Sequence, residues 1–436
     1  MALLIQFFKL IPAVILVLTA TIVPIGYSIH AAYAVAAPSS AGPTINDPNL
    51  KVEVVFKGLK KPTSMTFLGP NDILVLEKDI GTVQRIINGK MLAEPLLDVN
   101  VANANERGLL GIAVAKHTNG PTYVFLYYTE AKVDGEDDCP KLSYCVPGHD
   151  PLGNRLYRYE LVDNKLVNPK LLLDLPAVPG PNHDAGKVLV GPDQNVYLII
   201  GDVRAHRTQA ENTPNGPPPD GTGGILRVTQ DGVAVQTNPL GNTDPLNKYY
   251  AYGIRNGFGM DFDPITKNLW DTENGPAFGD EINIVEPGFN SGWVKIMGLA
   301  KDDLTKSKAD PARDLVNFDG KGKYRDPEFV WTQPVAPTAL KFFNSNKLGK
   351  QYENDIFVGD VNIGNIYHFK LGQQRTGLLL DGPLADKDAD NAQEIEKITF
   401  GTGFGGITDI QVGPDGYLYI LTIQGTIFRI VPSSLA

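Results

Sequence analysis

Cysteine is almost absent from this chain, since only Cys139 and Cys145 occur among 436 residues. So few cysteines exclude a disulfide-rich scaffold and a four-cysteine metal site, and the C-x-x-C-H sequence of covalent haem attachment does not occur. The two cysteines lie close together in a polar stretch with proline and glycine. In an exported protein this spacing predicts one disulfide that closes a small surface loop.

Positive charge is also in short supply. The chain has 39 Lys and Arg against 49 Asp and Glu, a formal net charge of −10, and the two signs are interspersed. No basic stripe is present to neutralise phosphates, so a nucleic-acid partner is not expected. A mildly acidic surface is also an ordinary route to solubility and therefore identifies no partner.

The longest apolar run lies at the N-terminus, where Lys9 is the only charge before about residue 27. Small residues at 32–36 then offer A-x-A sites, the order typical of a secretory signal. The run is nearly long enough to span a bilayer if it stays uncleaved. We expect a signal peptide or membrane anchor at 1–36, a linker at 37–50 and a folded domain at 51–436. The protein would then be secreted or extracellular, with membrane association only through this N-terminal segment.

Long helical periodicity is missing too, whereas 45 Gly and 33 Pro suit short strands joined by turns. A turn of the Gly/Asp-Pro-Asp/Asn type, an alternating apolar strand and a second strand recur along the chain. The copies lie at 67–89, 122–161, 188–232, 261–288, 354–372 and 412–432. Their irregular spacing argues against a solenoid. The pattern predicts an all-β fold, a six-bladed β-propeller of four-stranded antiparallel blades.

One turn does not recur. His183 lies in the sequence PNHDAGKVLVGPD (181–193), directly before an apolar strand. An imidazole titrates near neutrality, so His183 is a candidate for proton transfer. A loop histidine that merely caps a turn is the structural alternative.

Three motifs give the chain a resemblance to a known family. They are ERGLLGIAV (106–114), the His183 turn, and YGIRNGFGMDFDP (252–264) followed by TENGPAFGDEINIVEPGFNSGW (272–293). Over about residues 50 to 432 the chain resembles the soluble quinoprotein glucose/sorbosone dehydrogenases. The resemblance implies a propeller that oxidises the anomeric carbon of aldoses to lactones. Pyrroloquinoline quinone (PQQ) would accept the hydride, and calcium would anchor the quinone.

The resemblance also assigns roles to single residues. His183 falls on the general base and Arg255 on the cation that stabilises the reduced quinone. The carbonyls of Gly275 and Pro276 match those that hold calcium. The cofactor-facing polar positions are Glu106, Asn256, Asn274 and Lys341.

Several of these residues have a structural alternative. Arg255 and Asn256 would also suit a hydrogen-bonded pair between blades, and Glu106 would suit an ion pair with a neighbouring arginine. The face on which Lys341 lies depends on the strand register. Asp280 is expected to tie neighbouring strands rather than bind metal.

The chain departs from the family near its C-terminus. Relatives carry Arg-x-Arg-Asp before the last Gly-Pro-Asp turn, whereas here Asp409 is kept and the arginine positions fall on Gly406 and Thr408. A tricarboxylate cofactor needs cations, and Lys187, Arg204 and Arg207 are candidates to replace the missing arginines.

The sequence therefore predicts an exported, PQQ- and calcium-dependent sugar dehydrogenase that acts on a small-molecule sugar. It would pass electrons to an external acceptor, since no haem motif is present. Two alternatives stay open. One is a propeller without cofactor that binds a glycan or a protein partner, and the other is a calcium-dependent lactonase-type hydrolase.

Overall fold

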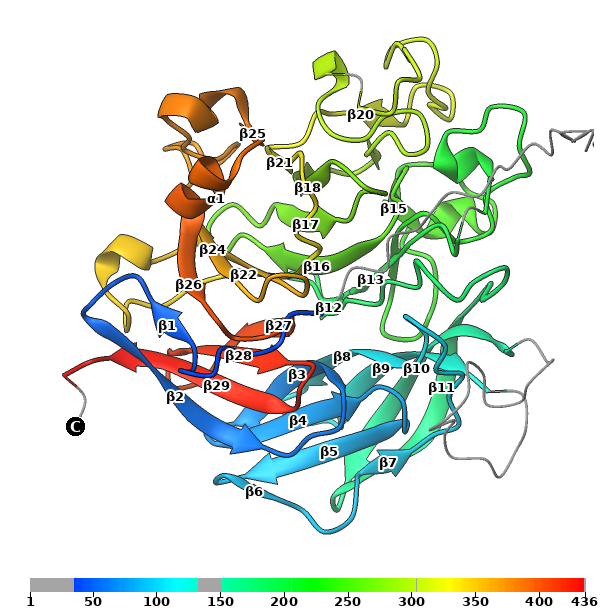
Figure 1. Cartoon of the computed structure of the whole chain (residues 1–436). Helices are drawn as coiled ribbons and strands as arrows, with labels where there is room; N and C mark the ends of the chain where they lie inside the picture. Colours follow the sequence, from blue (N-terminus) through cyan, green and yellow to red (C-terminus); the bar gives the residue numbers. More distant parts are fainter. Residues whose placement is uncertain (1–34, 132–150, 205, 303, 435–436) are drawn as a thin grey trace, which may run out of the picture. The chain divides into compact units, whose positions relative to one another are not determined.

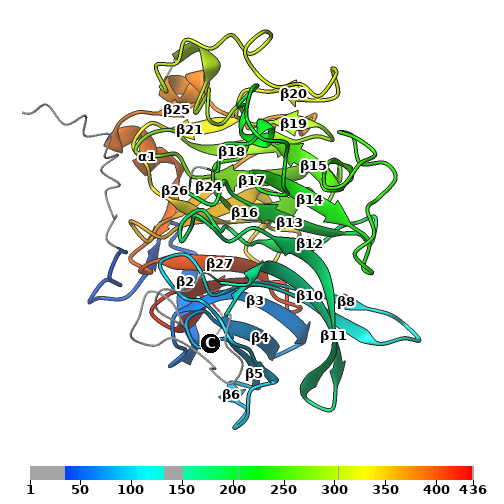
Figure 2. The ribbon, with the colours of Figure 1, turned by 90° about the vertical axis from the view of Figure 1, so that its right-hand side faces the viewer.

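Six separate sheets account for the strands of the described residues (Figures 1 and 2). The computed structural model describes residues 35–131, 151–204, 206–302 and 304–434. In those ranges the helical structure is one α-helix, α1 (Ala392–Ile398), and five short 3-10 helices. Residues 1–34 of the predicted leader and both cysteines lie outside the described residues. No helix in the described ranges is long and apolar enough to cross a membrane.

The first three sheets follow one another along the chain. The first contains β3 (Pro62–Gly69), β4 (Asp72–Glu77), β5 (Thr82–Ile87), β6 (Lys90–Met91) and β7 (Leu97–Asp98). The second contains β8 (Leu109–Lys116), β9 (Thr122–Glu130), β10 (Gly153–Val162) and β11 (Lys165–Leu175). The third contains β12 (Val188–Val190), β13 (Val196–Ile200), β14 (Gly224–Val228), β15 (Tyr249–Tyr252), β19 (Phe289–Asn290) and β20 (Lys323–Tyr324).

The other three sheets include the two N-terminal strands. The fourth contains β16 (Gly257–Phe262), β17 (Leu269–Glu273), β18 (Asp280–Val285), β21 (Phe329–Trp331) and β25 (Asp388–Ala389). The fifth contains β22 (Pro337–Phe342), β23 (Ile356–Asp360), β24 (Ile366–Phe369), β26 (Thr399–Thr402) and β1 (Thr44–Ile45). The sixth contains β27 (Ile407–Val412), β28 (Leu418–Thr422), β29 (Thr426–Pro432) and β2 (Leu50–Lys57).

One strand from each sheet lies on the inside, and these six inner strands together form a closed ring. Strand β3 contacts β8, and the contacts continue through β12, β16, β22 and β27 back to β3. Six clusters of buried apolar side chains fill the spaces between neighbouring sheets, and each cluster draws on two sheets. Both faces of a sheet are thus buried against its neighbours. This arrangement confirms the prediction of an all-β propeller.

The number of strands per sheet is less regular than predicted. Only the second and sixth sheets have four strands, and the third has six. The additional strands are two-residue segments, and β19, β20 and β25 join in parallel orientation. They come from the long inserts, whose backbone pairs with sheet edges that would otherwise carry unpaired N–H and C=O groups.

The inner strands of the ring run in the same direction where contacts define it. The Thr63 hydroxyl at the start of β3 donates to the carbonyl of Leu109 at the start of β8, 2.7 Å away. The Thr338 hydroxyl near the start of β22 donates to the carbonyl of Ile407, the first residue of β27. The starts of the inner strands therefore lie at one end of the ring, which we call the N-terminal rim.

The N-terminal segment is tied to the C-terminal sheets. Strand β2 pairs antiparallel with β29 and so closes the ring, and β1 pairs with β26. The backbone N–H of Ala36 donates to Val361 at 3.2 Å. The stretch 37–50, predicted as a linker, is therefore attached to the fifth and sixth sheets.

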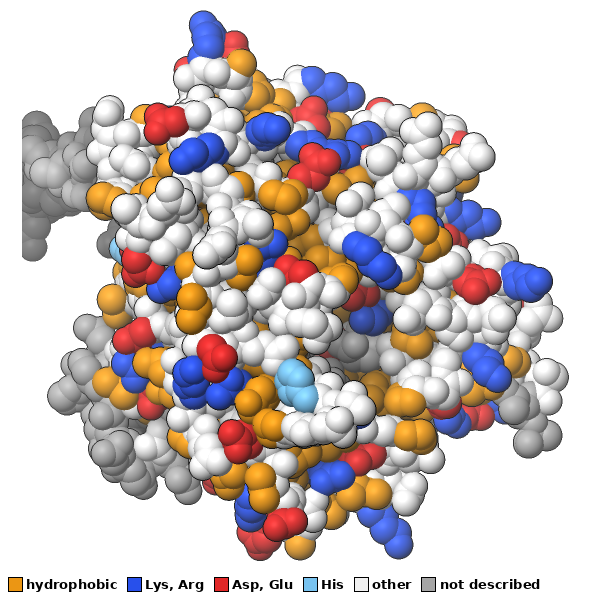
Figure 3. Space-filling model, turned by 180° about the vertical axis from the view of Figure 1, so that it is seen from behind, with side chains coloured by type: hydrophobic (Ala, Val, Ile, Leu, Met, Phe, Trp, Pro, Cys, Tyr) orange, Lys and Arg blue, Asp and Glu red, His pale blue; other side chains and the backbone are white. Residues whose placement is uncertain are grey.

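Charge is mixed on the face that Figure 3 shows, where Lys and Arg side chains alternate with Asp and Glu. This face has no continuous basic area of the kind that would follow a nucleic-acid backbone.

Candidate active site

His183 lies in the turn before β12, at the N-terminal rim. Its backbone adopts a φ of 66°, and its side chain is buried. The backbone N–H donates to Oε2 of Glu106 at 2.6 Å, and Nδ1 lies 2.5 Å from Oδ1 of Asp202. Gly201 permits this close approach, because a Cβ there would lie 2.6 Å from the His183 carbonyl and 2.4 Å from that of Arg255.

Asp202 fixes the orientation of the imidazole. It follows β13, the antiparallel partner of β12, so it returns to the rim at which β12 begins. Its Oδ2 accepts a 2.8 Å hydrogen bond from Nε1 of Trp293, and the carboxylate is fully buried. Because a carboxylate accepts, the neutral imidazole of His183 carries its proton on Nδ1, which leaves the lone pair on Nε2. His183 is thus held as a base with Nε2 as the reactive atom.

Arg255 brings a buried cation to the same rim, two residues before the start of β16 and next to Asn256. Its Nη1 donates to the carbonyls of Asn274 at 2.7 Å and Gly275 at 2.9 Å. Its guanidinium carbon lies 5.4 Å from the centre of the Trp293 ring. Burial lowers the pKa of Arg255, and the nearby carboxylates of Asp202 and Glu106 oppose that effect. An arginine stays charged under these conditions.

Buried carboxyl groups surround this cation. The backbone N–H of Arg255 donates to Oε1 of Glu273 at 2.6 Å, and burial raises the pKa of Glu273 to about 7. Asp184, next to His183, accepts from Asn154 at 2.9 Å, and its Oδ2 has no hydrogen-bond partner. Burial, followed by the charge of Glu106, raises the pKa of Asp184 to about 6.

Besides Oδ2 of Asp184, three further polar atoms of the site are buried without a hydrogen-bond partner. They are Nε of Arg255, Oδ1 of Asn256 and Oδ1 of Asn274. Asn256 is positioned by its Nδ2, which donates to Glu106 at 3.1 Å. Buried polar groups in proteins nearly always have a partner. One donor and two acceptors left over at one rim fit a polar ligand such as a carboxylated quinone with a sugar.

One of the two carbonyls predicted to bind calcium is already hydrogen-bonded to another group. The Gly275 carbonyl already accepts from Arg255, so a cation bound there would face a guanidinium. Calcium prefers six to eight oxygen ligands, and Pro276 adds one half-buried residue. The residues as arranged do not fit calcium.

Asp280 has the structural role that the sequence suggested. Its Oδ1 accepts from the Gly275 N–H at 2.8 Å, and its Oδ2 accepts from the N–H groups of Val335 at 2.8 Å and Ala336 at 2.7 Å. It therefore ties the start of β18 to the turn before β22.

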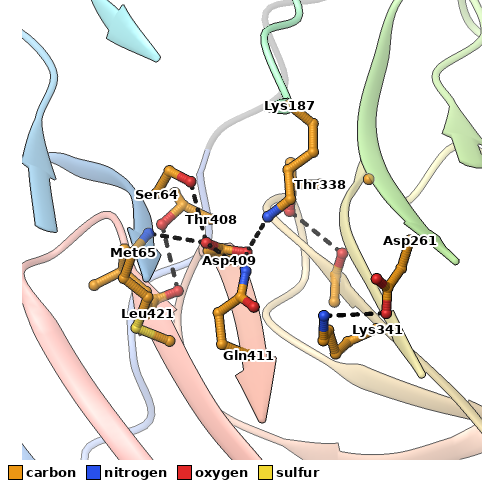
Figure 4. A network of polar contacts seen from close by, with 12 residues as sticks. Ser64, Met65, Lys187, Asp261, Thr338, Lys341, Thr408, Asp409, Gln411 and Leu421 are labelled. Atoms are coloured by element: carbon orange, nitrogen blue, oxygen red, sulfur yellow. Dashed lines mark hydrogen bonds and ion pairs between the residues drawn. The ribbon is translucent and has the colours of Figure 1, made fainter. Parts of the chain in front are cut away.

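Lys341 is not brought into this cluster. It is the fifth residue of β22, and its Nζ lies 3.1 Å from Oδ2 of Asp261, the fifth residue of β16 (Figure 4). Both positions are far along their strands from the N-terminal rim. The ammonium is therefore paired within the ring and removed from His183.

Lys187 is also committed to a partner. Its Nζ lies 2.7 Å from Oδ1 of Asp409, and both side chains are buried (Figure 4). Two inner strands separate β12 from β27 in either direction around the ring. The ion pair therefore spans the centre of the ring. Oδ2 of Asp409 accepts from the Met65 N–H of β3 at 2.9 Å.

The structure explains the glycine at the first missing arginine position. A Cβ on Gly406 would lie 2.5 Å from Cγ1 of Val35 and 2.9 Å from Cγ2 of Val361. The Gly406 N–H donates to the Ala36 carbonyl at 3.1 Å. In the uncleaved chain the N-terminal segment thus fills the space that an arginine side chain would need, and Val361 narrows that space in either form.

Sequence reasoning missed two residues of this site, Asp202 and Trp293. The first had a usable signal, because the residue after the second strand of a hairpin returns to the edge where the first strand begins. Trp293 ends the 272–293 motif, but no sequence rule places its indole against Asp202.

The arrangement suits proton abstraction next to a developing negative charge. A family model described as Glucose / Sorbosone dehydrogenase matches residues 59–429. The chain belongs to the glucose/sorbosone dehydrogenase family. The resemblance noted in the sequence is thereby confirmed.

Curated relatives agree with this assignment. The chain is 25% identical to the aldose sugar dehydrogenase YliI of Escherichia coli over 392 residues, 88% of this chain and 93% of the relative. It is 28% identical to quinoprotein glucose dehydrogenase B of Acinetobacter calcoaceticus over 436 aligned positions, 86% of this chain and 85% of the relative.

Solved structures share the fold. The PQQ-bound aldose sugar dehydrogenase of Streptomyces coelicolor aligns with a TM-score of 0.62 at 22% identity, covering 91% of this chain and 99% of the other. The apo-form of the E. coli soluble aldose sugar dehydrogenase aligns with a TM-score of 0.64 at 23% identity, covering 88% and 99%.

Proposed function

We propose that the protein is a PQQ-dependent sugar dehydrogenase that oxidises the anomeric carbon of aldoses to lactones. The observation that carries the proposal is the His183–Asp202 pair near Arg255, with three buried polar atoms that have no hydrogen-bond partner. The sugar dehydrogenases among the relatives support an oxidoreductase that acts on sugars.

The roles of the residues follow from the geometry. Nε2 of His183 accepts the proton of the anomeric hydroxyl as C1 loses a hydride and the C1–O bond becomes a carbonyl. Asp202 keeps Nδ1 protonated and stabilises the imidazolium that forms. Arg255 holds positive charge where negative charge develops.

PQQ, when bound, supplies an electrophilic carbonyl carbon that accepts the hydride. Arg255, Asn256 and Asn274 would hold it, since each has a buried polar atom free for a ligand. Calcium dependence was expected from the family resemblance, but the arrangement does not support it, because the Gly275 carbonyl already accepts from Arg255.

The proposal is tested by equilibrium titration of the purified chain with PQQ, in calcium and in EDTA, followed by fluorescence and calorimetry. We expect saturable, stoichiometric binding that is lost in Arg255→Ala and kept in Arg313→Ala, whose exposed side chain pairs with Asp310. Absence of binding at high micromolar PQQ would refute the proposal.

A second candidate is a propeller without cofactor that binds a glycan or a protein. The filled arginine position at Gly406 and the commitment of Lys187 to Asp409 favour it. It predicts no PQQ uptake by a folded protein. The hydrolase alternative has no such support, because the described residues hold no group of three or more His, Cys, Asp or Glu placed for a metal.

We also infer that each of the six sheets is one propeller blade, and that the protein is exported and passes electrons to an external acceptor. The apolar N-terminal run supports export. N-terminal sequencing of the protein recovered outside the cell would show whether the chain is cleaved before residue 37.

A further inference from the structure

The loop after β13 holds Arg207 in a fixed place beside the site. On one side, the His206 N–H donates to the Asp202 carbonyl at 2.7 Å. On the other side, the buried Thr208 hydroxyl lies 2.6 Å from Oε2 of Glu211 and accepts from the Ala210 N–H at 3.0 Å. The backbone is thus anchored immediately before and after Arg207, although its side chain is exposed.

The side chain of Arg207 reaches the same indole as the buried arginine. Its guanidinium carbon lies 5.4 Å from the centre of the Trp293 ring, the distance also found for Arg255. Trp293 in turn bonds Asp202, the partner of His183. Arg207 is therefore one side chain away from the His183–Asp202 pair.

Arg207 has no ion pair with a carboxylate among the described residues, whereas the two candidate lysines each have one. Lys187 is paired with Asp409 and Lys341 with Asp261. A guanidinium that packs on an aromatic ring keeps its in-plane N–H donors available, and those donors match a carboxylate in a two-point contact. An exposed, fixed and unpaired arginine at the edge of the site is arranged to bind an anion.

The site has more acidic than basic side chains available to an anionic cofactor. Glu106, Asp184 and Asp202 bring acidic side chains to the rim. Of the buried cations near them, Arg107 donates to the Ala177 carbonyl, Lys78 pairs with Asp79, and Arg255 donates to two backbone carbonyls. The arginine positions of the family fall on Gly406, which packs against Val35, and on Thr408. A tricarboxylate cofactor would meet too little positive charge without a further cation.

We propose that Arg207 binds a carboxylate of the anionic cofactor at the mouth of the His183 site and so replaces the arginines missing at Gly406 and Thr408. The inference rests on the proposed function. It moves anion recognition from the sixth sheet to the loop after β13 in the third sheet.

The test compares PQQ dissociation constants of the full chain, Arg207→Gln and the control Arg313→Gln, without sugar and at fixed salt. We expect Arg207→Gln to bind about ten- to a hundredfold more weakly, the loss of one charge-assisted contact. The control should bind as the unchanged chain does, and all three should melt at the same temperature.

A second probe separates carboxylate recognition from a general loss of the pocket. The trimethyl ester of PQQ lacks the negative charges, so Arg207→Gln should bind it as well as the unchanged chain does. Equal PQQ affinity of Arg207→Gln and the unchanged chain would overturn the inference and leave the proposed function intact. Failure of the unchanged chain to bind PQQ would overturn both.

Discussion

A hairpin brings His183 and Asp202 together across 19 positions of sequence. The imidazole gains its orientation from a carboxylate whose second oxygen is held by Trp293. Neither oxygen of Asp202 is left for substrate. Asp202 therefore acts on the reaction through His183, as a positioning residue.

Replacing Asp202 with Asn tests this arrangement. The amide would donate to Nδ1, so Nε2 would carry the proton and lose its basicity. We expect kcat of the PQQ-loaded protein to fall by about 10²- to 10⁴-fold with little change in KM. The matched control is Asp355→Asn, which alters the His368–Asp355 pair (2.8 Å) and should leave kcat unchanged. Equal kcat for both variants would contradict the role of Asp202.

The buried carboxyl of Asp184 predicts a pH-dependent stability. Burial raises its pKa to about 6 in the folded protein, above the ordinary value of 3.8. The folded state therefore binds the proton more tightly, and this stabilising effect is complete below pH 3.8 and lost as pH rises through about 6. Asp184→Asn imitates the protonated form. In the unchanged chain, Asp184 should lower the free energy of unfolding by about 2–3 kcal/mol as the pH rises from 3.8 to about 6. Asp184→Asn should not show this decline.

Urea unfolding at several pH values between 4 and 8 measures this difference. The control is Asp319→Asn, an exposed aspartate with a φ of 58° that asparagine tolerates. The control should follow the unchanged chain. If the free energy of unfolding depended on pH in Asp184→Asn as it does in the unchanged chain, the Asp184 carboxyl would not be the cause of that dependence.

Part of the site was predictable from residue types and spacing, and part was not. Glu106, His183, Arg255 and Asn256 follow motifs, and the structure brings them to one rim. Lys341 has the right chemistry, but its position along β22 pairs it with Asp261 instead. A motif places a residue on a strand, whereas the depth of that residue in the ring depends on where the strand begins.

At the scale of elements, close approach of neighbouring backbones fixes certain glycines. A Cβ on Gly111 of β8 would lie 1.9 Å from the Gly186 carbonyl and 2.8 Å from Val188 Cγ2. We expect Gly111→Ala to lower the unfolding free energy by about 3 kcal/mol, because backbone must move. Chemical unfolding measures the loss. Gly69→Ala on β3 is the control, since no atom lies within 4 Å of its added Cβ, and equal losses would contradict the account.

The N-terminal segment shows where composition misleads. Serine, glycine and proline at 37–50 suggested a linker, but β1 pairs with β26 and Ala36 bonds Gly406. Short polar segments gain order from the edges of sheets formed elsewhere in the chain. Local composition does not contain that information.

At the scale of the whole molecule, the repeats predict the propeller because each copy contributes strands to one sheet. The inserts could not be predicted in the same way, and they supply the additional short strands of the third and fourth sheets. Packing between sheets uses alternating apolar residues, which sequence displays, whereas edge pairing uses backbone groups, which every residue has.

We expect the contributions of Lys187 and Asp409 to the free energy of unfolding to be strongly coupled, because the two side chains form a buried ion pair across the ring. Lys187→Met would leave the buried Asp409 carboxylate without its counter-ion, at a cost of about 3–5 kcal/mol in unfolding free energy. Lys187→Met with Asp409→Leu should recover most of this loss. The exposed pair Lys248–Asp244 is the control, and Lys248→Met should cost less than about 1 kcal/mol. A double variant no more stable than Lys187→Met would contradict the coupling.

The central claim is that His183 abstracts a proton from an aldose next to bound PQQ. Single-turnover absorbance of the PQQ-loaded chain, mixed with glucose under anaerobic conditions, tests it most directly. We predict rapid bleaching of the bound quinone in the unchanged chain, and bleaching at least about 10²-fold slower in His183→Asn that still binds PQQ. Equal bleaching in the two proteins, or no bleaching with any aldose in the unchanged chain, would contradict the account.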